Sequence, residues 1–393
     1  MRWWKALLVL VVAVAVAPGH AQRAVDPARV GPGQTCTVIT QASADASAGT
    51  VNINHDGTPL AGTPAPDISR GFDGIPRSAQ PRLTASQQRI LECTHRVAEA
   101  NADIPYTLFV PSTYDPRKPA PLVVDLHGLN ITPLQQILFD GTTDFAERYG
   151  FIVLAPMGFN LSSWWGSRTG TPVATAAVKP GGDARYTNTE LAEIDTMALL
   201  KSIREQYAVD SDRLYLMGHS MGGAGVYYLG GKYNEIWAGL APISGAGGIA
   251  DGAAERYKSL PTLIMHGAKD SIVPPATSRR AVAALQAVGA PHVYLELPDK
   301  DHEFWIRRGA GQMEKVFLFF NLVSKRTTVL VQLQPYFALF FSSDSIGSHS
   351  STLFPSGSRI HANFPLSSES GPFKISTSFC FSCANISDML SIR

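Results

Sequence analysis

Six short apolar runs along the middle of the chain constrain its fold more than any other feature. Several are almost continuously apolar, as expected for strands buried on both faces of a parallel sheet. The runs are PLVVDLHG (121–128), FIVLAPMG (151–158), RLYLMGHS (213–220), WAGLAPISG (237–245), TLIMHGAKD (262–270) and VYLELPD (293–299). Helix-like segments separate them: apolar residues recur every three or four positions in 191–207, and Gly289 is a plausible end for a second helix in 278–289. This alternation predicts an α/β fold with a mostly parallel central sheet and helices on both faces.

The chain begins with a segment typical of export. Two basic residues precede an apolar stretch from Ala6 to Ala17, and small residues follow up to Ala21. We interpret residues 1–21 as a signal peptide, because the apolar stretch is shorter than the roughly 20 residues that span a bilayer as a helix. No later stretch is long and apolar enough to span, so we expect a secreted or periplasmic protein without a membrane span in its mature form.

The overall composition limits the partners of the chain. Its 393 residues are 45% apolar and carry a formal net charge of +1, with Lys and Arg scattered along the sequence. Such a chain can bury a large core. It has no basic face of the kind that nucleic acid or an anionic membrane requires, so neither is an expected partner.

Changes in composition and periodicity divide the rest of the chain into three parts. Residues 22–102 are rich in Ala, Gly, Pro, Thr and Asp, and we expect a loop-rich lead-in there. The strand-like and helix-like segments follow in 103–326. Residues 327–393 are crowded with Ser and Phe and lack periodicity, which favours a poorly structured accessory tail or a non-native extension such as a frameshift product.

The four cysteines suit an oxidising compartment, but their spacing leaves the pairing open. A bond between Cys36 and Cys93 is one option. Cys380 and Cys383 have the CxxC spacing of redox and zinc motifs, yet no second cysteine pair accompanies them. We interpret this spacing as incidental and expect no metal site.

Ser220 is the candidate nucleophile. It lies in Gly218-His219-Ser220-Met221-Gly222, between a strand-like run and AGVYYLGGKY, which can form a helix. At a sharp strand-to-helix turn the nucleophile is strained and exposed, and side chains two residues before or after it would collide with backbone, which explains glycine at both places. The alternative is a Gly-rich turn in which the serine only makes a local hydrogen bond.

Two backbone N–H groups are candidates for stabilising the oxyanion of an acyl-transfer intermediate. Met221 follows the nucleophile and opens a helix, and Leu129 lies in the loop DLHGLN after an earlier strand. We expect the neighbouring His127 to brace that loop instead of reacting.

The base and the orienting acid are expected in loops that follow the last two strands. His302 in PDKDHEFW follows the last strand and Asp270 in MHGAKDSIVP the penultimate one, which gives the chain order Ser, acid, His. The base accepts the serine proton and the acid orients the imidazole. The alternative for Asp270 is a carboxylate that caps its loop. Asp195, near the start of its helix, is attributed to the positive end of that helix.

These stretches resemble the α/β-hydrolase fold. Residues 103–326 look like secreted esterases and predicted peptidases related to polyhydroxybutyrate depolymerases, feruloyl esterases and the catalytic domain of prolyl oligopeptidases. The resemblance rests on YTLFVPSTYDPRKPAPLVVDLHG, AVDSDRLYLMGHSMGGAGVYYLG, APISGAG, LIMHGAKDSIVP and DHEFW. It implies that 103–326 is the catalytic domain and that no metal or organic cofactor is needed. It further implies a triad of Ser220, Asp270 and His302, with Met221 and Leu129 forming the oxyanion hole.

The substrate is less constrained than the chemistry. Residues 160–190 form an insertion long enough to arch over the site, and its Trp164, Trp165 and Tyr186 either form an aromatic substrate platform or only pack the loop. We expect a secreted serine hydrolase that cleaves small-molecule or oligomeric carboxylic esters. The alternatives are a serine peptidase acting on small peptides and a non-catalytic binding protein of the same fold.

Overall fold

A computed structural model of the chain describes residues 35–47, 82–167, 185–304, 311–326, 359–363 and 379–382. The signal peptide expected in 1–21 lies outside the described residues. Within the described part, no helix combines the length and the apolar character needed to cross a membrane.

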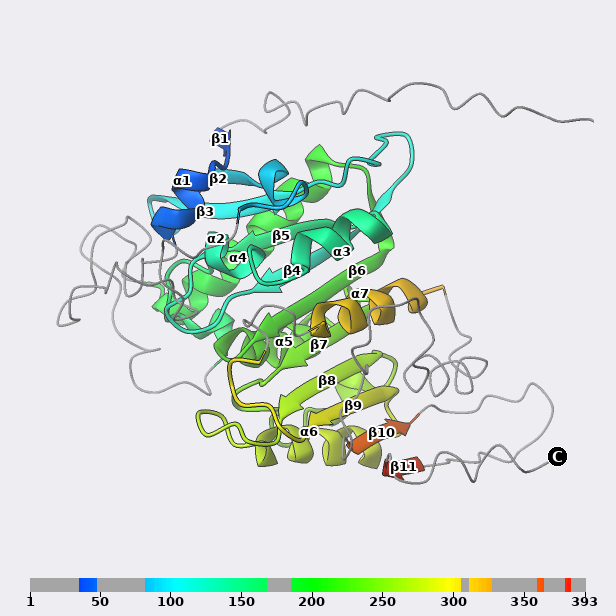
Figure 1. Cartoon of the computed structure of the whole chain (residues 1–393). Helices are drawn as coiled ribbons and strands as arrows, with labels where there is room; N and C mark the ends of the chain where they lie inside the picture. The colour runs from blue at the N-terminus through cyan, green and yellow to red at the C-terminus, as the bar shows by residue number, and fades with distance from the viewer. Residues whose placement is uncertain are drawn as a thin grey trace, which may run out of the picture.

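A parallel sheet forms the centre of the molecule (Figure 1). Its strands lie in the order β5-β4-β6-β7-β8-β9, and each neighbouring pair is parallel. The strands are β4 (Ala120–Leu126), β5 (Ile152–Pro156), β6 (Val209–His219), β7 (Gly239–Ile243), β8 (Thr262–Gly267) and β9 (His292–Leu297). Each overlaps one of the apolar runs in the sequence, so the expected parallel sheet is confirmed.

Helices cover both faces of this sheet, as the sequence predicted. On one face, α4 (Asn188–Gln206), α5 (Met221–Lys232) and α6 (Ala276–Ala287) pack with Leu122 and Val124 of β4. On the other face, Val123 packs with residues of α2 (Pro133–Ile137), α3 (Thr142–Tyr149) and α7 (Gln312–Leu322). Because successive strand side chains point to opposite faces, β4 contributes to two separate cores, which explains its continuously apolar sequence.

Helix α4 begins three residues earlier than its apolar periodicity indicated. The Thr187 side chain accepts a hydrogen bond from the Glu190 N–H, and the Glu190 side chain accepts one from the Thr187 N–H. This capping box satisfies N–H groups that have no acceptor inside the helix, so it fixes the start of α4 at Asn188.

Three antiparallel strands extend the sheet beside β5, and the first two of them come from the expected lead-in. They are β1 (Thr35–Val38), β2 (Leu91–Val97) and β3 (Ala102–Phe109), in the order β1-β2-β3-β5, and the short helix α1 (Gln41–Ser47) follows β1. β2 alternates buried and more exposed residues, which is typical of a strand that covers a core with one face. Part of the segment expected to be loop-rich therefore belongs to the sheet.

The opposite edge of the sheet takes two strands from the C-terminal segment. β10 (Arg359–Asn363) pairs antiparallel with β9, and β11 (Phe379–Ser382) pairs with β10. The rest of 327–393 lies outside the described residues.

Cys36 and Cys93 face each other in the β1–β2 ladder and form a disulfide. The bond joins residues that are 57 positions apart in the sequence and ties the outermost strand on this side to β2. It answers the pairing question that the cysteine spacing left open.

Replacing both bridged cysteines, Cys36→Ala/Cys93→Ala, should lower the free energy of unfolding by about 4 kcal/mol, because the open chain gains conformational entropy when it is unfolded. Denaturant unfolding of the oxidised protein and the double variant measures the difference. A reducing agent should destabilise the native protein and leave the variant unchanged. Equal stability of the oxidised protein and the variant would contradict a closed, stabilising bond.

Candidate active site

Ser220 lies at a strained bend between β6 and α5. Its backbone has φ 59° and ψ −113°, a combination that residues other than glycine rarely adopt. The Ser220 N–H donates to the Ile243 carbonyl over 2.9 Å, and its own carbonyl accepts from the Ala246 N–H over 3.1 Å. These bonds to the end of β7 and the loop after it hold the bend in place.

The glycines on either side of Ser220 have a steric reason. A Cβ built on Gly222 would lie 2.0 Å from the Leu126 carbonyl oxygen, at the end of β4. A Cβ on Gly218 would lie 2.7 Å from the carbonyl group of Gly222. Backbone fills both places, so the tight passage from strand to helix depends on residues without side chains.

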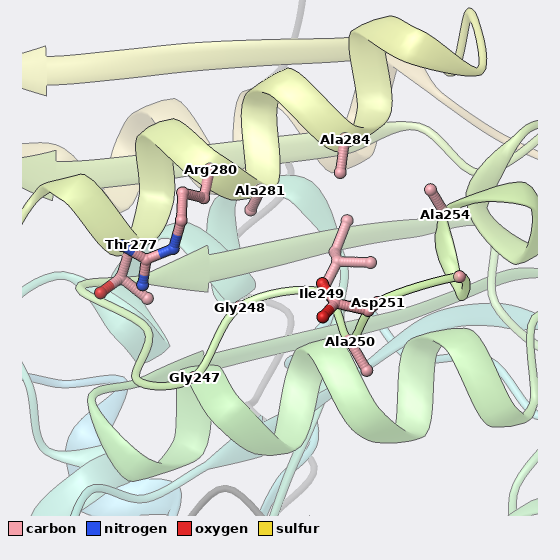
Figure 2. A pocket seen from close by; sticks show the side chains of 11 residues that line it. Gly247, Gly248, Ile249, Ala250, Asp251, Ala254, Thr277, Arg280, Ala281 and Ala284 are labelled. Carbon is pink, nitrogen blue, oxygen red and sulfur yellow. The ribbon is translucent and has the colours of Figure 1, made fainter.

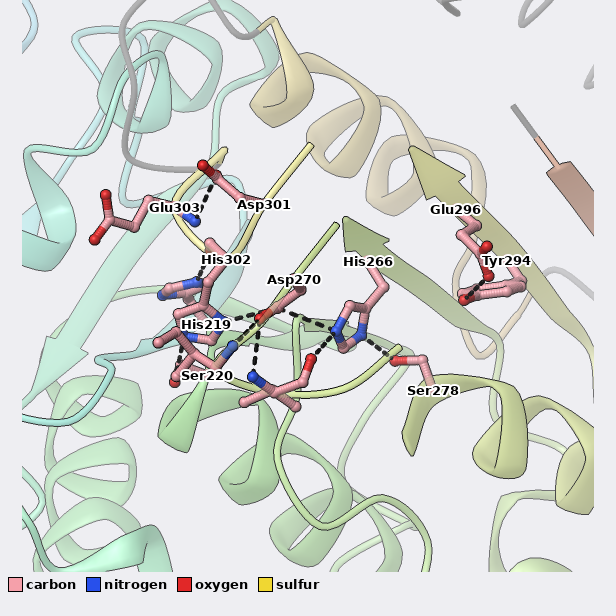
Figure 3. Close-up of polar contacts among 12 residues, drawn as sticks. His219, Ser220, His266, Asp270, Ser278, Tyr294, Glu296, Asp301, His302 and Glu303 are labelled. Atoms are coloured by element: carbon pink, nitrogen blue, oxygen red, sulfur yellow. Dashed lines mark hydrogen bonds and ion pairs between the residues drawn. The ribbon is translucent and has the colours of Figure 1, made fainter. Parts of the chain in front are cut away.

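His302 is within hydrogen-bond distance of the Ser220 side chain at this bend, and Asp270 is within hydrogen-bond distance of His302 (Figure 3). His302 Nε2 lies 2.9 Å from Ser220 Oγ, and His302 Nδ1 lies 2.7 Å from Asp270 Oδ2. His302 comes from the loop after β9 and Asp270 from the loop after β8. The structure thus brings together the three side chains that the sequence singled out for nucleophile, base and acid.

Asp270 is buried and accepts several hydrogen bonds. Its Oδ1 accepts from the N–H groups of Ile272 and Val273, at 2.9 and 2.8 Å, and its Oδ2 contacts the imidazoles of His302 and His266. Burial alone would raise the pKa of Asp270. The bonds from the two imidazoles and the backbone outweigh burial and hold the pKa well below its usual range, so the carboxyl is ionised.

The loop after β4 lies against the Ser220 bend. A Cβ built on Gly128 would lie 3.4 Å from the His219 carbonyl oxygen. The Leu129 N–H makes no backbone hydrogen bond to another described residue. The Met221 N–H is the first of α5 and therefore has no acceptor inside that helix. Both N–H groups proposed for the oxyanion thus belong to segments that meet at the bend.

His127 braces this loop, as expected. Its ring is buried, with Nδ1 2.8 Å from the Gly128 carbonyl oxygen and Nε2 2.8 Å from that of Met157. Burial lowers the pKa of His127, which is consistent with a structural imidazole.

The aromatic residues of the insertion differ in their surroundings. Trp165 is 1% exposed, donates its Nε1–H to the His127 carbonyl over 3.2 Å and meets the His127 ring edge-on. Tyr186 packs against a small cluster that contains Ile104 and Phe159. These contacts favour loop packing for Trp165 and Tyr186. Trp164 is only partly buried, and residues 168–184 of the insertion lie outside the described residues.

His219, which directly precedes Ser220, makes a contact that the sequence pattern did not indicate. Its Nε2–H donates to the His302 carbonyl over 2.8 Å, and the two rings lie 4.7 Å apart between centroids. Burial and the neighbouring His302 lower the pKa of His219 to about 3, so this ring stays neutral. It positions the backbone that carries His302.

The attribution of Asp195 to the positive end of its helix is wrong. Asp195 lies in the third turn of α4 and is fully buried. Its Oδ1 lies 2.5 Å from His95 Nε2, and its Oδ2 accepts from the Phe159 N–H over 2.8 Å. These polar contacts join β2 and the loop after β5 to α4, and they account for a carboxyl group at this position better than the helix dipole does.

A cavity of about 170 Å³ lies between α6 and the loop after β7 (Figure 2). Gly247 lines it and directly follows Ala246, whose N–H bonds the Ser220 carbonyl. Arg280 and Asp251 also line it, and both are exposed.

The described residues contain no group of three or more His, Cys, Asp or Glu side chains placed to hold a metal ion.

The variant Gly222→Ala should lower the free energy of unfolding by about 3 kcal/mol, because its methyl group meets the Leu126 carbonyl. The matched control Gly128→Ala meets its nearest atoms at 3.4 Å and should cost less than about 1 kcal/mol. Urea unfolding of the two variants measures both values. Equal losses would contradict the steric account of the bend.

Comparisons with known proteins agree with this architecture. A family model described as "Putative esterase" matches residues 98–271, and one described as "Prolyl oligopeptidase family" matches 249–325. A bifunctional acetylxylan esterase/xylanase of Neocallimastix patriciarum is 25% identical over 166 residues, which are 42% of this chain and 21% of that enzyme. Feruloyl esterase B of Thermothelomyces thermophilus is 28% identical over 189 residues, 47% of this chain and 58% of that protein.

Among solved structures, a thermostable esterase is 28% identical with a TM-score of 0.46, and the match covers 60% of this chain and 63% of that one. The chain spans less than two thirds of the length of either curated relative. The esterase model covers the sheet from β3 to β8 with the Ser220 bend, and the oligopeptidase model continues through His302. The parallel sheet with helices on both faces is that of an α/β-hydrolase fold, and the chain is similar to esterases over residues 98–271 and to prolyl oligopeptidases over 249–325.

Proposed function

We propose that this chain is a serine hydrolase that cleaves carboxylic esters through an acyl-enzyme intermediate. The proposal rests on a chain of two hydrogen bonds that joins Ser220 Oγ to His302 and His302 to Asp270. Ser220 lies at a strained strand-to-helix bend. A serine hydroxyl becomes a useful nucleophile only with such a base in reach, and an orienting acid makes the base effective.

In the acylation step, Ser220 Oγ attacks the ester carbonyl carbon while His302 Nε2 takes the hydroxyl proton. The ionised Asp270 stabilises the imidazolium that forms. The N–H groups of Met221 and Leu129 donate to the oxyanion of the tetrahedral intermediate. The intermediate then collapses: the bond to the alcohol oxygen breaks, His302 returns the proton to that oxygen, and the alcohol leaves.

Deacylation repeats these roles with water as the nucleophile. His302 takes a proton from water, the hydroxide adds to the acyl carbon, and the bond to Ser220 Oγ breaks with return of the proton to the serine. The products are a carboxylic acid and an alcohol. No step calls for a metal ion or an organic cofactor.

The proposed substrates are small-molecule or oligomeric esters. Support comes from the esterase family model and from relatives named for esters of ferulic acid or acetylated xylan. An aromatic acyl or alcohol group would contact Trp164, which is only partly buried.

A serine peptidase acting on small peptides is the second candidate. The match of residues 249–325 to the prolyl oligopeptidase family favours it, because this segment holds both Asp270 and His302. Hydrolysis of chromogenic short-chain esters, compared with aminoacyl anilides, separates the two activities. A non-catalytic protein of this fold would hydrolyse neither and would not react with a fluorophosphonate probe.

We also propose an extracellular or periplasmic location. The Cys36–Cys93 bond supports it, since structural disulfides form and persist mainly in oxidising compartments. The basic and apolar N-terminal sequence supports it independently.

The variant Ser220→Ala should lower kcat for ester hydrolysis by a factor on the order of 10⁵ to 10⁶, because the nucleophile is removed. Ester hydrolysis by the purified protein measures the loss. Ser112→Ala, which changes a serine in the turn after β3, is the matched control and should retain full activity. Undiminished turnover by Ser220→Ala would exclude Ser220 as the nucleophile.

The variant Trp164→Ala should raise KM for aromatic esters more than for acetyl esters, because an aromatic platform contributes contact area only to the larger group. Steady-state kinetics with one substrate of each kind measures the two ratios. Equal changes in KM would remove Trp164 from the substrate site.

A further inference from the structure

Asp270 Oδ2 is shared by two imidazoles. His302 Nδ1 lies 2.7 Å from it, and His266 Nε2, at the end of β8, lies 3.1 Å from the same oxygen (Figure 3). The side chain of His266 is completely buried, as is that of Asp270. The catalytic roles proposed above use only one of these two imidazoles.

The surroundings of His266 fix its tautomer. Nε2 also lies 2.9 Å from the Val273 carbonyl oxygen, so both of its neighbours are acceptors and Nε2 carries the proton. On the other side of the ring, Nδ1 lies 2.7 Å from Ser278 Oγ in α6. The Nε2–H therefore faces two acceptors at once: it bonds the Val273 carbonyl and contacts the Asp270 carboxylate.

A second donor on the same oxygen changes what Asp270 does to His302. It stabilises the carboxylate anion and withdraws charge from Oδ2, so the bond from His302 to that oxygen becomes weaker. It also fixes the side-chain torsion of Asp270, since Oδ1 is already held by backbone N–H groups. Both effects act on the imidazole that is to accept the serine proton.

We propose that His266 is a positioning residue for the reaction: its Nε2–H holds Asp270 ionised and directed at His302, and so sets the pH above which His302 can act as the base. This inference rests on the proposed ester hydrolase function. A buried histidine that only fills space would contribute to stability and leave that pH unchanged.

Other titratable side chains lie near His302 in the described part of the chain. Asp270 faces it from the loop after β8, with His266 of β8 on the other side of that carboxylate, and His219 faces it from the end of β6. Burial and the neighbouring His302 lower the pKa of His219 to about 3. On the loop of His302 itself, Asp299 pairs with Lys269 over 3.0 Å, Asp301 Oδ1 accepts from the Glu303 N–H, and Lys300 bonds Lys269 through its backbone.

The test compares two replacements of His266. His266→Gln keeps an N–H donor near the position of Nε2, whereas His266→Met keeps an unbranched side chain of similar reach without a donor. The acid limb of kcat/KM against pH reports the protonation of the free enzyme's base. In His266→Met this limb should move to higher pH by about 0.5–1 unit, because a more basic Asp270 favours the imidazolium. In His266→Gln it should stay near the wild-type position.

The matched control is His292→Met. His292 is a buried histidine at the start of β9, beside Thr262 at the opposite end of β8. This control should be destabilised without any movement of the acid limb. If His266→Met does not fold, His266→Asn replaces it, because its shorter amide faces Ser278 and cannot reach Asp270. An unmoved limb in the folded donor-free variant, or equal movement in His266→Gln, would overturn the proposal.

A second readout does not need turnover. The His302 titration, followed by NMR in the folded protein, should have a higher midpoint in the donor-free variant and an unchanged one in His266→Gln. Failure of the proposed function would be recognised separately, as a wild-type protein that hydrolyses no ester and does not react with a fluorophosphonate. The NMR midpoints would still decide the role of His266.

Discussion

The bend at Ser220 is the constraint on which the site depends. A non-glycine residue is held at φ 59° between the longest strand of the central sheet and a helix, and backbone of neighbouring segments occupies the space that side chains at 218 and 222 would need. Backbone strain of this kind persists only where the surroundings determine it. Here β4 and β7, on either side of β6, provide those surroundings, and the serine oxygen is presented at their carboxyl ends.

The parallel sheet explains how residues far apart in the sequence meet there. In parallel strands, all loops that follow a strand lie at the same edge of the sheet, which is where open α/β folds place their sites. The loops after β4, β6, β8 and β9 bring Leu129, Ser220, Asp270 and His302 to this edge. Two further histidines lie at the same edge: His219, the last residue of β6, contacts His302, and His266, the residue before the end of β8, contacts Asp270.

The sequence predicted the elements whose physical signature is local. Central strands were found because burial on both faces leaves continuous apolar runs, and the triad candidates were found because each follows such a run. β2 was not predicted, although Leu91, Cys93 and Val97 alternate with more polar residues. The alternating stretch is short and follows Gly- and Pro-rich sequence, which is typical of a loop. The roles of Trp165 and Asp195 depend on partners 30 or more positions away, which no local pattern indicates. The role of His266 depends on its burial, which the sequence does not show either.

The central claim is that Ser220 forms a covalent ester with the acyl group of the substrate. The most direct measurement is mass spectrometry of the protein quenched during turnover of a slowly deacylated ester, followed by peptide mapping. The account predicts a mass increase equal to the acyl group, located on the peptide that contains Ser220 and absent from Ser220→Ala. An active enzyme whose adduct maps to another residue, or persists in that variant, would contradict it.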